Sequence, residues 1–141
     1  MWARSKDRYA SSFGHLLPRL GIRHPQGFTG WNEPGLRYQT IQGDLMLEPG
    51  VELLATPGHT PGHQSLLLRL PNSGILLFTF DAVGTRALWQ ADELGAADDP
   101  AAARASVDRL RAVASQTRAQ VVCGHDLEQW VALRHPPAYY D

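Results

Sequence analysis

The sequence has few of the features that mark membrane or secreted proteins. It contains one cysteine, Cys123, among 141 residues, so no disulfide can form within the chain. No apolar run approaches the ~18 residues that a membrane-spanning helix needs. The first residues carry charge and lack the apolar segment of a secretory signal peptide. Because a single free thiol is also typical of a reducing compartment, we expect a cytoplasmic protein.

An excess of charge of one sign is missing as well. Lys and Arg number 13 and Asp and Glu number 14, which gives a formal net charge of −1, and no basic stripe runs through the chain. A nucleic-acid partner is therefore not expected. Hydrophobic residues make up 43% and charged residues 19%, a balance typical of a folded globular domain. The length fits one domain, residues 1–141.

The first 38 residues and the rest of the chain differ in their patterns. Residues 1–38 contain many prolines and glycines and predict mostly loop, with a short helix near residues 11–17. Residues 39–141 carry clearer signals and should contain the sheet, the main helix and the functional motifs. We interpret the chain as a single partial domain with a poorly defined lead-in.

Alternating and continuous apolar segments predict an α/β or α+β domain. The predicted strands are 38–42 (YQTIQ), 44–48 (DLMLE), 51–56 (VELLAT), 65–70 (SLLLRL), 75–80 (ILLFTF) and 120–124 (QVVCG). A helix should begin at Pro100, capped by Asp98 or Asp99. Its apolar stripe is Ala103, Val107, Leu110 and Ala114. The order strand, helix, strand predicts layers in which helices cover a sheet.

Three metal-capable side chains fall where predicted strands end or turn. His63 and His125 each follow a glycine, and Asp81 directly follows the strand 75–80. Rigid strand ends next to accessible loops are typical positions for functional residues. Imidazole and carboxylate groups are ligands for zinc, manganese or iron, so a metal site is one interpretation. The other is a structural or surface role, which we expect for the remaining isolated histidines: His15, His24 and His135.

The segments TPGHTPGHQSLLLRL, LLFTFDA and VVCGHDLEQW, in this order, resemble the second half of metallo-β-lactamase-superfamily hydrolases, in particular the N-acyl-homoserine-lactonase-like group. The likeness extends over residues 36–130. It implies the C-terminal half of an αββα sandwich with a zinc centre at one edge. It also implies that His63, Asp81 and His125 bind metal, with Asp81 as the catalytic carboxylate that bridges two ions. His59 is implied to support the turn without binding metal.

The resemblance implies that metal-activated water opens a small-molecule lactone or ester. One family motif, H-x-H-x-D-H, does not occur in the chain. With His63, Asp81 and His125 alone we expect at most one weakly held zinc, because a stable zinc site takes three or four protein ligands. Gly84 stands where the lactonase-like group commonly has a tyrosine that contacts the substrate carbonyl. These departures leave open that the chain is a fragment and is inactive alone.

Two other functions remain open from the sequence. The chain could be a catalytically inactive remnant that serves as an interaction module, or a thiolesterase of the glyoxalase-II type. In a half-sandwich, the strands 65–70 and 75–80 would have apolar faces with nothing on them. Because such a face normally finds a partner or causes aggregation, we expect the isolated chain to be marginally stable or to form a homodimer through the sheet. Trp130 is predicted to pack the last helix rather than to bind substrate.

Overall fold

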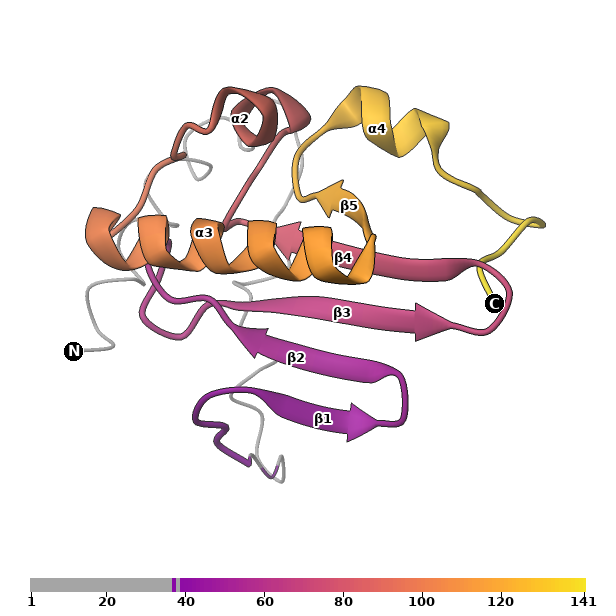
Figure 1. Cartoon of the computed structure of the whole chain (residues 1–141), viewed down its shortest axis with the longest axis horizontal. Helices are drawn as coiled ribbons and strands as arrows, with labels where there is room; N and C mark the ends of the chain where they lie inside the picture. The colour runs from indigo at the N-terminus through magenta and orange to yellow at the C-terminus, as the bar shows by residue number, and fades with distance from the viewer. Residues whose placement is uncertain (1–36, 38) are drawn as a thin grey trace, which may run out of the picture. The chain divides into compact units, whose positions relative to one another are not determined.

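The computed structural model describes residue 37 and residues 39–141, and the helix predicted near residues 11–17 lies outside these. Residues Thr40–Asp141 form one compact unit. In chain order its elements are β1 (Leu45–Glu48), β2 (Val51–Ala55), β3 (Gln64–Leu70), β4 (Gly74–Phe80), α2 (Arg86–Ala91), α3 (Pro100–Thr117), β5 (Gln120–Cys123) and α4 (Leu127–Ala132) (Figure 1). In this part of the chain, no helix has the length and hydropathy needed to cross a membrane.

The five strands form one sheet in the order β1-β2-β3-β4-β5. The first four run antiparallel to their neighbours, whereas β5 pairs parallel with β4. Parallel neighbours need a long crossover connection, and α3 provides it (Figure 1). This arrangement confirms the predicted mixed α/β class. It also places the carboxyl ends of β4 and β5 next to each other.

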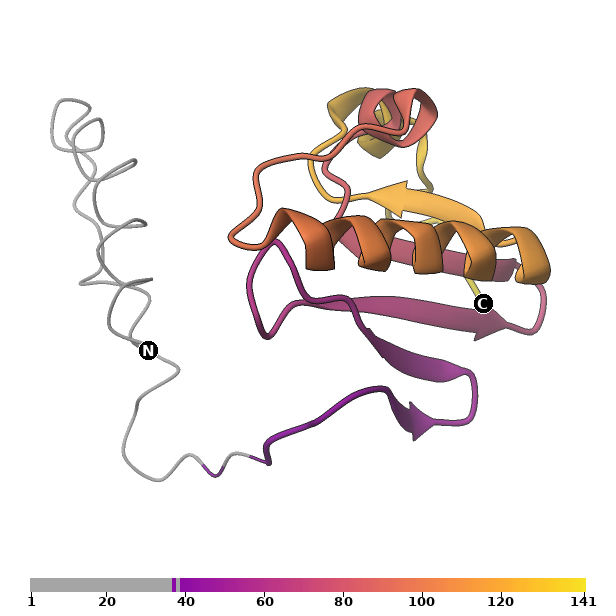
Figure 2. The same cartoon turned by 60° about the vertical axis from the view of Figure 1, so that its left-hand side comes forward.

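Helix α3 begins where the sequence predicts. The Asp99 carboxylate accepts a hydrogen bond of 3.0 Å from the Ala102 N–H, and Pro100 occupies the first turn, where its missing N–H is not needed. Figure 2 shows α3 lying along one face of the sheet. The cap and the proline therefore fix the point at which the crossover helix starts to cover the strands.

The hydrophobic core lies between α3 and this face of the sheet. Its buried centre consists of Leu54, Leu67, Leu77 and Leu110, one from each of β2, β3, β4 and α3. The predicted stripe is confirmed, because Ala103, Val107 and Leu110 are buried and Ala114 packs at the edge of the cluster. Burying four leucine side chains contributes about 1.5–3 kcal/mol each relative to leaving them exposed.

The opposite face of the sheet is less covered. Successive strand residues point to opposite faces, so Leu66, Leu68 and Phe78 point away from α3, and all three are only partly buried, although Leu76 is buried. Phe80 is 41% exposed, and its ring stacks on Phe78 with centroids 6.0 Å apart. Apolar side chains thus remain partly accessible on this face.

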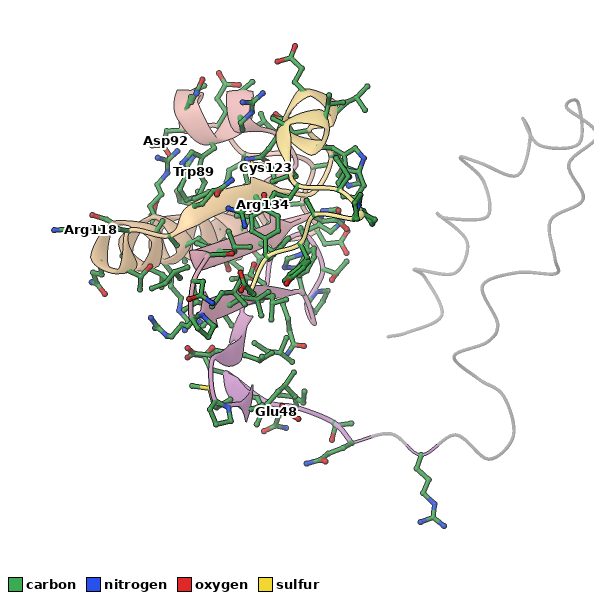
Figure 3. All side chains as sticks on the ribbon, turned by 90° about the vertical axis from the view of Figure 1, so that its right-hand side faces the viewer. Glu48, Trp89, Asp92, Arg118, Cys123 and Arg134 are labelled. Carbon is green, nitrogen blue, oxygen red and sulfur yellow. The ribbon has the colours of Figure 1, made fainter. Side chains whose placement is uncertain are left out.

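Helix α2, which the sequence did not predict, is tied to α3 by two arginines. Arg104 and Arg111 contact the Asp92 carboxylate at 2.7 and 3.2 Å. The Arg111 guanidinium also lies 4.7 Å from the centroid of the Trp89 ring, a cation–π contact. Figure 3 shows Trp89 and Asp92 at this junction. The N-cap Thr85, whose hydroxyl accepts from the Leu88 N–H, was the available sequence signal.

The strand predicted at residues 38–42 is wrong for residues 39–42, which form no regular structure, and residue 38 lies outside the description. A strand needs a hydrogen-bonded neighbour, and β1 is already the edge of the sheet that the structure describes. Gly43, with φ +76°, turns the chain just before β1 begins. Alternation alone therefore overestimated the number of strands.

Candidate metal centre

The predicted site residues lie at one end of the sheet. His59 and His63 belong to the loop between β2 and β3, Asp81 follows β4 directly, and His125 lies two residues after β5. Because β4 and β5 are parallel neighbours, their ends bring Asp81 and His125 into contact although 44 residues separate them in the chain. Strand pairing therefore positions two of the predicted residues.

The first Pro-Gly-His unit fixes the loop against α3. Gly58 has φ +135°, and a Cβ atom at this position would lie 2.2 Å from the Ala103 backbone nitrogen, so no other residue fits. The Asp99 N–H donates to the Gly58 carbonyl at 3.0 Å. Gly62, in the second unit, has open space around it. The repeated motif thus has different roles, because only its first glycine is required by close packing.

Hydrogen bonds to Thr56 fix the orientation of the His63 ring. Its Nδ1 atom lies 3.1 Å from the Thr56 carbonyl oxygen and 2.8 Å from the Thr56 hydroxyl. A carbonyl oxygen only accepts, so Nδ1 carries the proton and Nε2 keeps its lone pair. Burial lowers the pKa of His63, and the Thr56 backbone hydrogen bond and the Asp81 charge oppose this in part. The ring is therefore neutral at pH 7, the form that binds metals.

A chain of buried hydroxyl groups supports this tautomer. The Ser65 hydroxyl donates to the Thr79 carbonyl at 3.4 Å and lies 3.0 Å from the Thr56 hydroxyl. Because the Ser65 hydroxyl donates its proton to Thr79, it accepts a hydrogen bond from the Thr56 hydroxyl. The Thr56 hydroxyl in turn accepts a hydrogen bond from Nδ1 of His63. Thr56 and Ser65, which supply the two hydroxyl groups, and Thr79, which supplies the carbonyl, are fully buried. The Thr79 carbonyl oxygen can only accept, and this sets the direction of each hydrogen bond before it. The series of hydrogen bonds links His63 to Ser65 on β3 and Thr79 on β4.

Asp81 and His125 form the closest pair in the site. The His125 Nε2 atom lies 2.7 Å from Asp81 Oδ1, and the side chains are 71% and 37% exposed, respectively. The His125 backbone N–H donates to the Gly84 carbonyl at 2.7 Å. A Cβ atom at Gly84 would lie 3.6 Å from the His125 ring, an ordinary contact. The structure therefore has room for a side chain at the position where the resembled group has a tyrosine.

The backbone next to Asp81 is shaped unusually. The pairing of β4 with β5 is irregular between Phe78 and Phe80, and Phe80 has φ +47°, which is uncommon for a non-glycine residue. Gly124 packs against this bend, because a Cβ atom there would lie 2.5 Å from the Phe80 carbonyl oxygen. Irregular pairing and strained backbone of this kind re-aim side chains at functional sites. Here they direct Asp81 toward His125.

Asp126 holds the His125 loop without facing the site. Its carboxylate caps α4 by accepting from the Gln129 N–H at 2.8 Å. It also accepts from the Arg86 backbone N–H at 2.8 Å and from the Arg86 side chain at 3.1 Å. These hydrogen bonds from Arg86 and Gln129 lower the pKa of Asp126. The carboxylate of Asp126 therefore orients the loop that carries His125.

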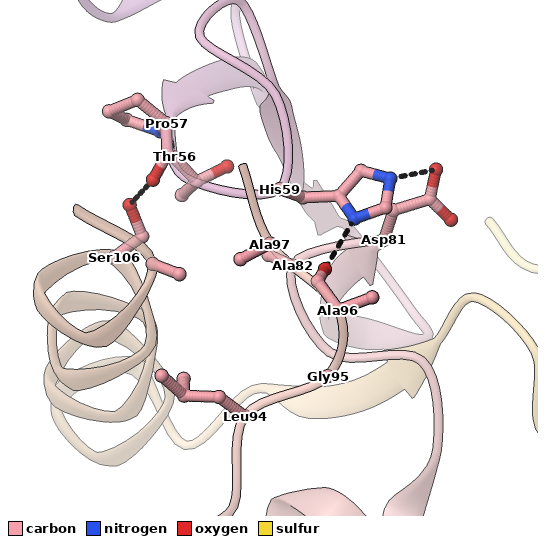
Figure 4. A pocket seen from close by; sticks show the side chains of 11 residues that line it. Thr56, Pro57, His59, Asp81, Ala82, Leu94, Gly95, Ala96, Ala97 and Ser106 are labelled. Atoms are coloured by element: carbon pink, nitrogen blue, oxygen red, sulfur yellow. Dashed lines mark hydrogen bonds and ion pairs between the residues drawn. The ribbon is translucent and has the colours of Figure 1, made fainter. Parts of the chain in front are cut away.

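His59 lies closer to Asp81 than the sequence indicated. Its Nδ1 atom is 2.9 Å from the Ala96 carbonyl oxygen, and its Nε2 atom is 3.5 Å from Asp81 Oδ2 (Figure 4). The sequence assigned His59 only to the turn. Its position after a glycine, which it shares with His63 and His125, was the signal that could have identified it.

The donor types fit one divalent cation. His59 and His63 each use Nδ1 in a protein hydrogen bond, which leaves both Nε2 atoms as nitrogen donors, and Asp81 supplies oxygen. Within residues 37 and 39–141, however, no three His, Cys, Asp or Glu side chains are already grouped so that they could hold a metal ion. A cation would therefore have to draw these side chains together.

Two cavities border these residues. His59 and Asp81 line a pocket of about 10 Å³, which is at the lower limit for one water molecule (Figure 4). A larger groove of about 300 Å³ extends from His125 along α4 and is lined by Leu127, Trp130 and Leu133. Trp130, predicted to pack the last helix, is 61% exposed. A small organic molecule fits only the second cavity.

Comparisons with known proteins relate these observations to function. The sequence model of the Metallo-beta-lactamase superfamily matches residues 3–125. The N-acyl homoserine lactonase AiiA of Bacillus thuringiensis subsp. kurstaki is 42% identical over 106 residues, which are 75% of this chain and 42% of the relative. The N-acyl homoserine lactonase AttM of Azorhizobium caulinodans is 40% identical over 144 residues, which are 90% of this chain and 55% of the relative.

Solved structures are similar in fold. An N-acyl homoserine lactone hydrolase with the product N-hexanoyl-L-homoserine bound at its catalytic metal center matches with a TM-score of 0.71 and 41% identity, over 77% of this chain and 43% of that one. A probable metal-dependent hydrolase from Staphylococcus aureus, at 17% identity and a TM-score of 0.53, shows the fold alone. The chain thus spans about half the length of the curated relatives it matches.

Proposed function

The chain belongs to the metallo-beta-lactamase superfamily, and we propose on this basis that it is the C-terminal half of a metal-dependent hydrolase that opens the ring of N-acyl homoserine lactones. The identity with N-acyl homoserine lactonases supports the reaction class. The observation that carries the proposal is the contact between Asp81 and His125, because two ionisable side chains from separate strand ends meet at an accessible edge.

We assign one zinc ion to His63, Asp81 and His125. A bound zinc ion would supply an activated water and polarise the carbonyl of the lactone. His63 is suited to this role because it is neutral and its ring is fixed by Thr56. Asp81 is suited because its carboxylate is partly exposed and held next to His125. Lactone substrates would place their apolar acyl chain in the groove along α4, beside Trp130.

A test uses the purified 141-residue chain with one equivalent of zinc and an N-acyl homoserine lactone. Metal content and ring opening should both be lost in Asp81→Asn. The control is Asp108→Asn, since Asp108 is an exposed aspartate on α3 that lies away from the site and pairs with Arg104 at 3.8 Å. A chain that retains no zinc and opens no lactone supports the interaction-module function instead. Faster cleavage of a glutathione thiolester would support the glyoxalase-II type.

A homodimer is the second part of the proposal, and the partly exposed sheet face supports it. Leu68 and Phe78 lie on the side away from α3 and are only partly buried. We expect light scattering to give twice the chain mass and Leu68→Lys to give a monomer. Leu127→Lys is the control, because Leu127 is 75% exposed but lies on α4. A wild-type chain that is monomeric at all concentrations, with a sharp melting transition, would contradict the dimer.

A further inference from the structure

We propose that residues 134–141 form a strap that fixes one wall of the groove along α4, and that Ser73 is the positioning residue that anchors this strap. The strap follows α4 and returns to the turn between β3 and β4 (Figure 1). The inference rests on the proposed function, which places the acyl chain of the substrate in this groove. It adds the residues that set the position of the groove wall and therefore the affinity for an apolar ligand.

Helix α4 has little apolar packing to hold it in place. It has six residues, Leu127–Ala132, whereas isolated helices shorter than about 12 residues are marginal in water. Its large apolar side chains, Leu127, Trp130 and Val131, are mostly exposed. Gln129 is its only buried residue. Polar contacts must therefore hold α4 against the rest of the unit.

The first half of α4 is fixed to β5. The Gln129 side-chain oxygen accepts from the Cys123 N–H at 2.7 Å, and its side-chain nitrogen donates to the Val121 carbonyl at 2.7 Å. Strand β5 is the last strand of the described sheet, so Gln129 occupies the place of a further strand. These contacts do not hold the second half of α4, which carries Trp130.

Three hydrogen bonds from the strap converge on the hydroxyl group of Ser73, in the turn between β3 and β4. The hydroxyl donates to Asp141 Oδ1 at 3.2 Å, and it accepts from the Asp141 N–H at 3.0 Å and from Arg134 Nη1 at 3.1 Å. A hydroxyl group has one proton and two lone pairs, so the strap uses its whole hydrogen-bonding capacity. Ser73 therefore joins the first and the last residue of the strap at one point.

The backbone of the same turn also binds Asp141. The N–H groups of Asn72 and Ser73 donate to the Asp141 carbonyl oxygen at 2.9 and 2.6 Å, and the Asn72 side-chain amide donates to Asp141 Oδ2 at 2.9 Å. Consecutive N–H groups that point into one concavity attract a negatively charged or partially negative group. The turn supplies donors and Asp141 supplies acceptors, so the two surfaces are complementary.

The other end of the strap is folded against α4. The Arg134 N–H donates to the Tyr140 hydroxyl at 3.2 Å, and the Arg134 guanidinium lies 4.9 Å from the centroid of the Tyr140 ring. His135 Nε2 lies 2.8 Å from the Trp130 carbonyl oxygen, and the two rings are 4.9 Å apart in an edge-to-face contact. Trp130 lines the groove. Ser73 thus acts on the groove through the strap and Trp130.

Fluorine NMR of the full chain labelled with fluorotryptophan tests the proposal, with decanoate as the groove ligand. The Trp130 resonance is assigned by its absence in Trp130→Phe. Ser73→Ala removes three exposed hydrogen bonds, each at the lower end of the usual range, so the ratio of closed to open strap should fall about tenfold. Affinity scales with the closed fraction, so the Kd of decanoate should rise by up to about tenfold. The Trp130 resonance should move toward its position in urea.

Three further variants complete the experiment. The double variant Ser73→Ala/Asp141→Ala also removes the contact between the Asn72 amide and the Asp141 carboxylate, and its effect should be larger. Ser73→Thr keeps the hydroxyl group and should restore the wild-type resonance and Kd. Thr117→Ala is the matched control, because it deletes a hydroxyl that donates to the Val113 carbonyl within α3. An unchanged resonance of Trp89, which packs against the core, shows that each variant is folded.

The outcomes separate the strap from the proposed function. Decanoate binding and a Trp130 resonance that stay unchanged in both the single and the double variant overturn the strap and leave the groove as the acyl-chain site. Equal effects of Ser73→Thr and Ser73→Ala do the same, since the hydroxyl group would then not be the anchor. A wild-type chain whose Trp130 resonance does not respond to decanoate overturns both the strap and the acyl-chain site, whereas ring opening at the metal centre remains a separate test.

Discussion

Replacing Thr56 by valine tests whether the buried hydroxyl chain holds His63. The substitution keeps the shape of a fully buried side chain and removes hydrogen bonds of 2.8 Å to His63 and 3.0 Å to Ser65. No donor is left without an acceptor, because His63 keeps the Thr56 carbonyl and Ser65 keeps the Thr79 carbonyl. The loss should therefore be the sum of two ordinary hydrogen bonds, about 1–3 kcal/mol, without an added desolvation penalty.

Thermal unfolding and metal titration together measure the effect of Thr56→Val. A loss of about 1 kcal/mol lowers the Tm of a domain of this size by roughly 4–8 °C. Zinc affinity should fall about tenfold, the lower end of the effect of losing an outer partner, because one acceptor for His63 remains. Thr56→Ser keeps the hydroxyl and serves as the control. Equal zinc affinity in the valine and serine variants would refute the argument that the hydroxyl chain orients the ring.

Two further predictions concern packing and pH. Gly124→Ala should lower the free energy of unfolding by about 2–3 kcal/mol and weaken zinc binding, because its Cβ atom would lie 2.5 Å from the Phe80 carbonyl oxygen. Gly62 lies in open space, so Gly62→Ala is the control and should leave the free energy of unfolding, measured with urea, unchanged. Hydrogen bonds from Arg109 lower the pKa of Asp44, so Asp44→Asn should lose roughly 0.5–1 kcal/mol above the unfolded pKa of about 3.9. This difference should disappear as pH falls below the folded pKa, and a constant difference from pH 6 to pH 2 would contradict it.

The sequence predicted those elements whose signals are local. The apolar runs of β3 and β4 and the cap of α3 at Asp99 depend on residues close in the chain, and all three elements were placed correctly. The strand expected at residues 38–42 failed for residues 39–42 because pairing is a property of two segments. The pattern of one segment cannot show that a neighbour is missing.

In the site, too, the sequence predicted some contacts and missed those that depend on segments far apart in the chain. The closeness of Asp81 and His125 could be anticipated, because strand ends gather at one edge of a sheet. The closeness of His59 to Asp81 could not, since it depends on Gly58 packing against Ala103 and on a carbonyl at Ala96. The first contact joins the turn to helix α3, and the second joins it to the loop before α3, 37 residues after His59. No spacing in the sequence encodes either contact.

The parallel pairing of β4 and β5 has a consequence for the order of folding. The antiparallel strands β1 to β4 can pair as soon as they are synthesised, because their contacts are close in the chain. The carboxylate of Asp81, in contrast, meets His125 only after α3 has crossed the sheet and β5 has joined it. Contacts between residues so far apart in sequence form late in folding. The ion-binding edge should therefore be the last part of the unit to reach its native structure.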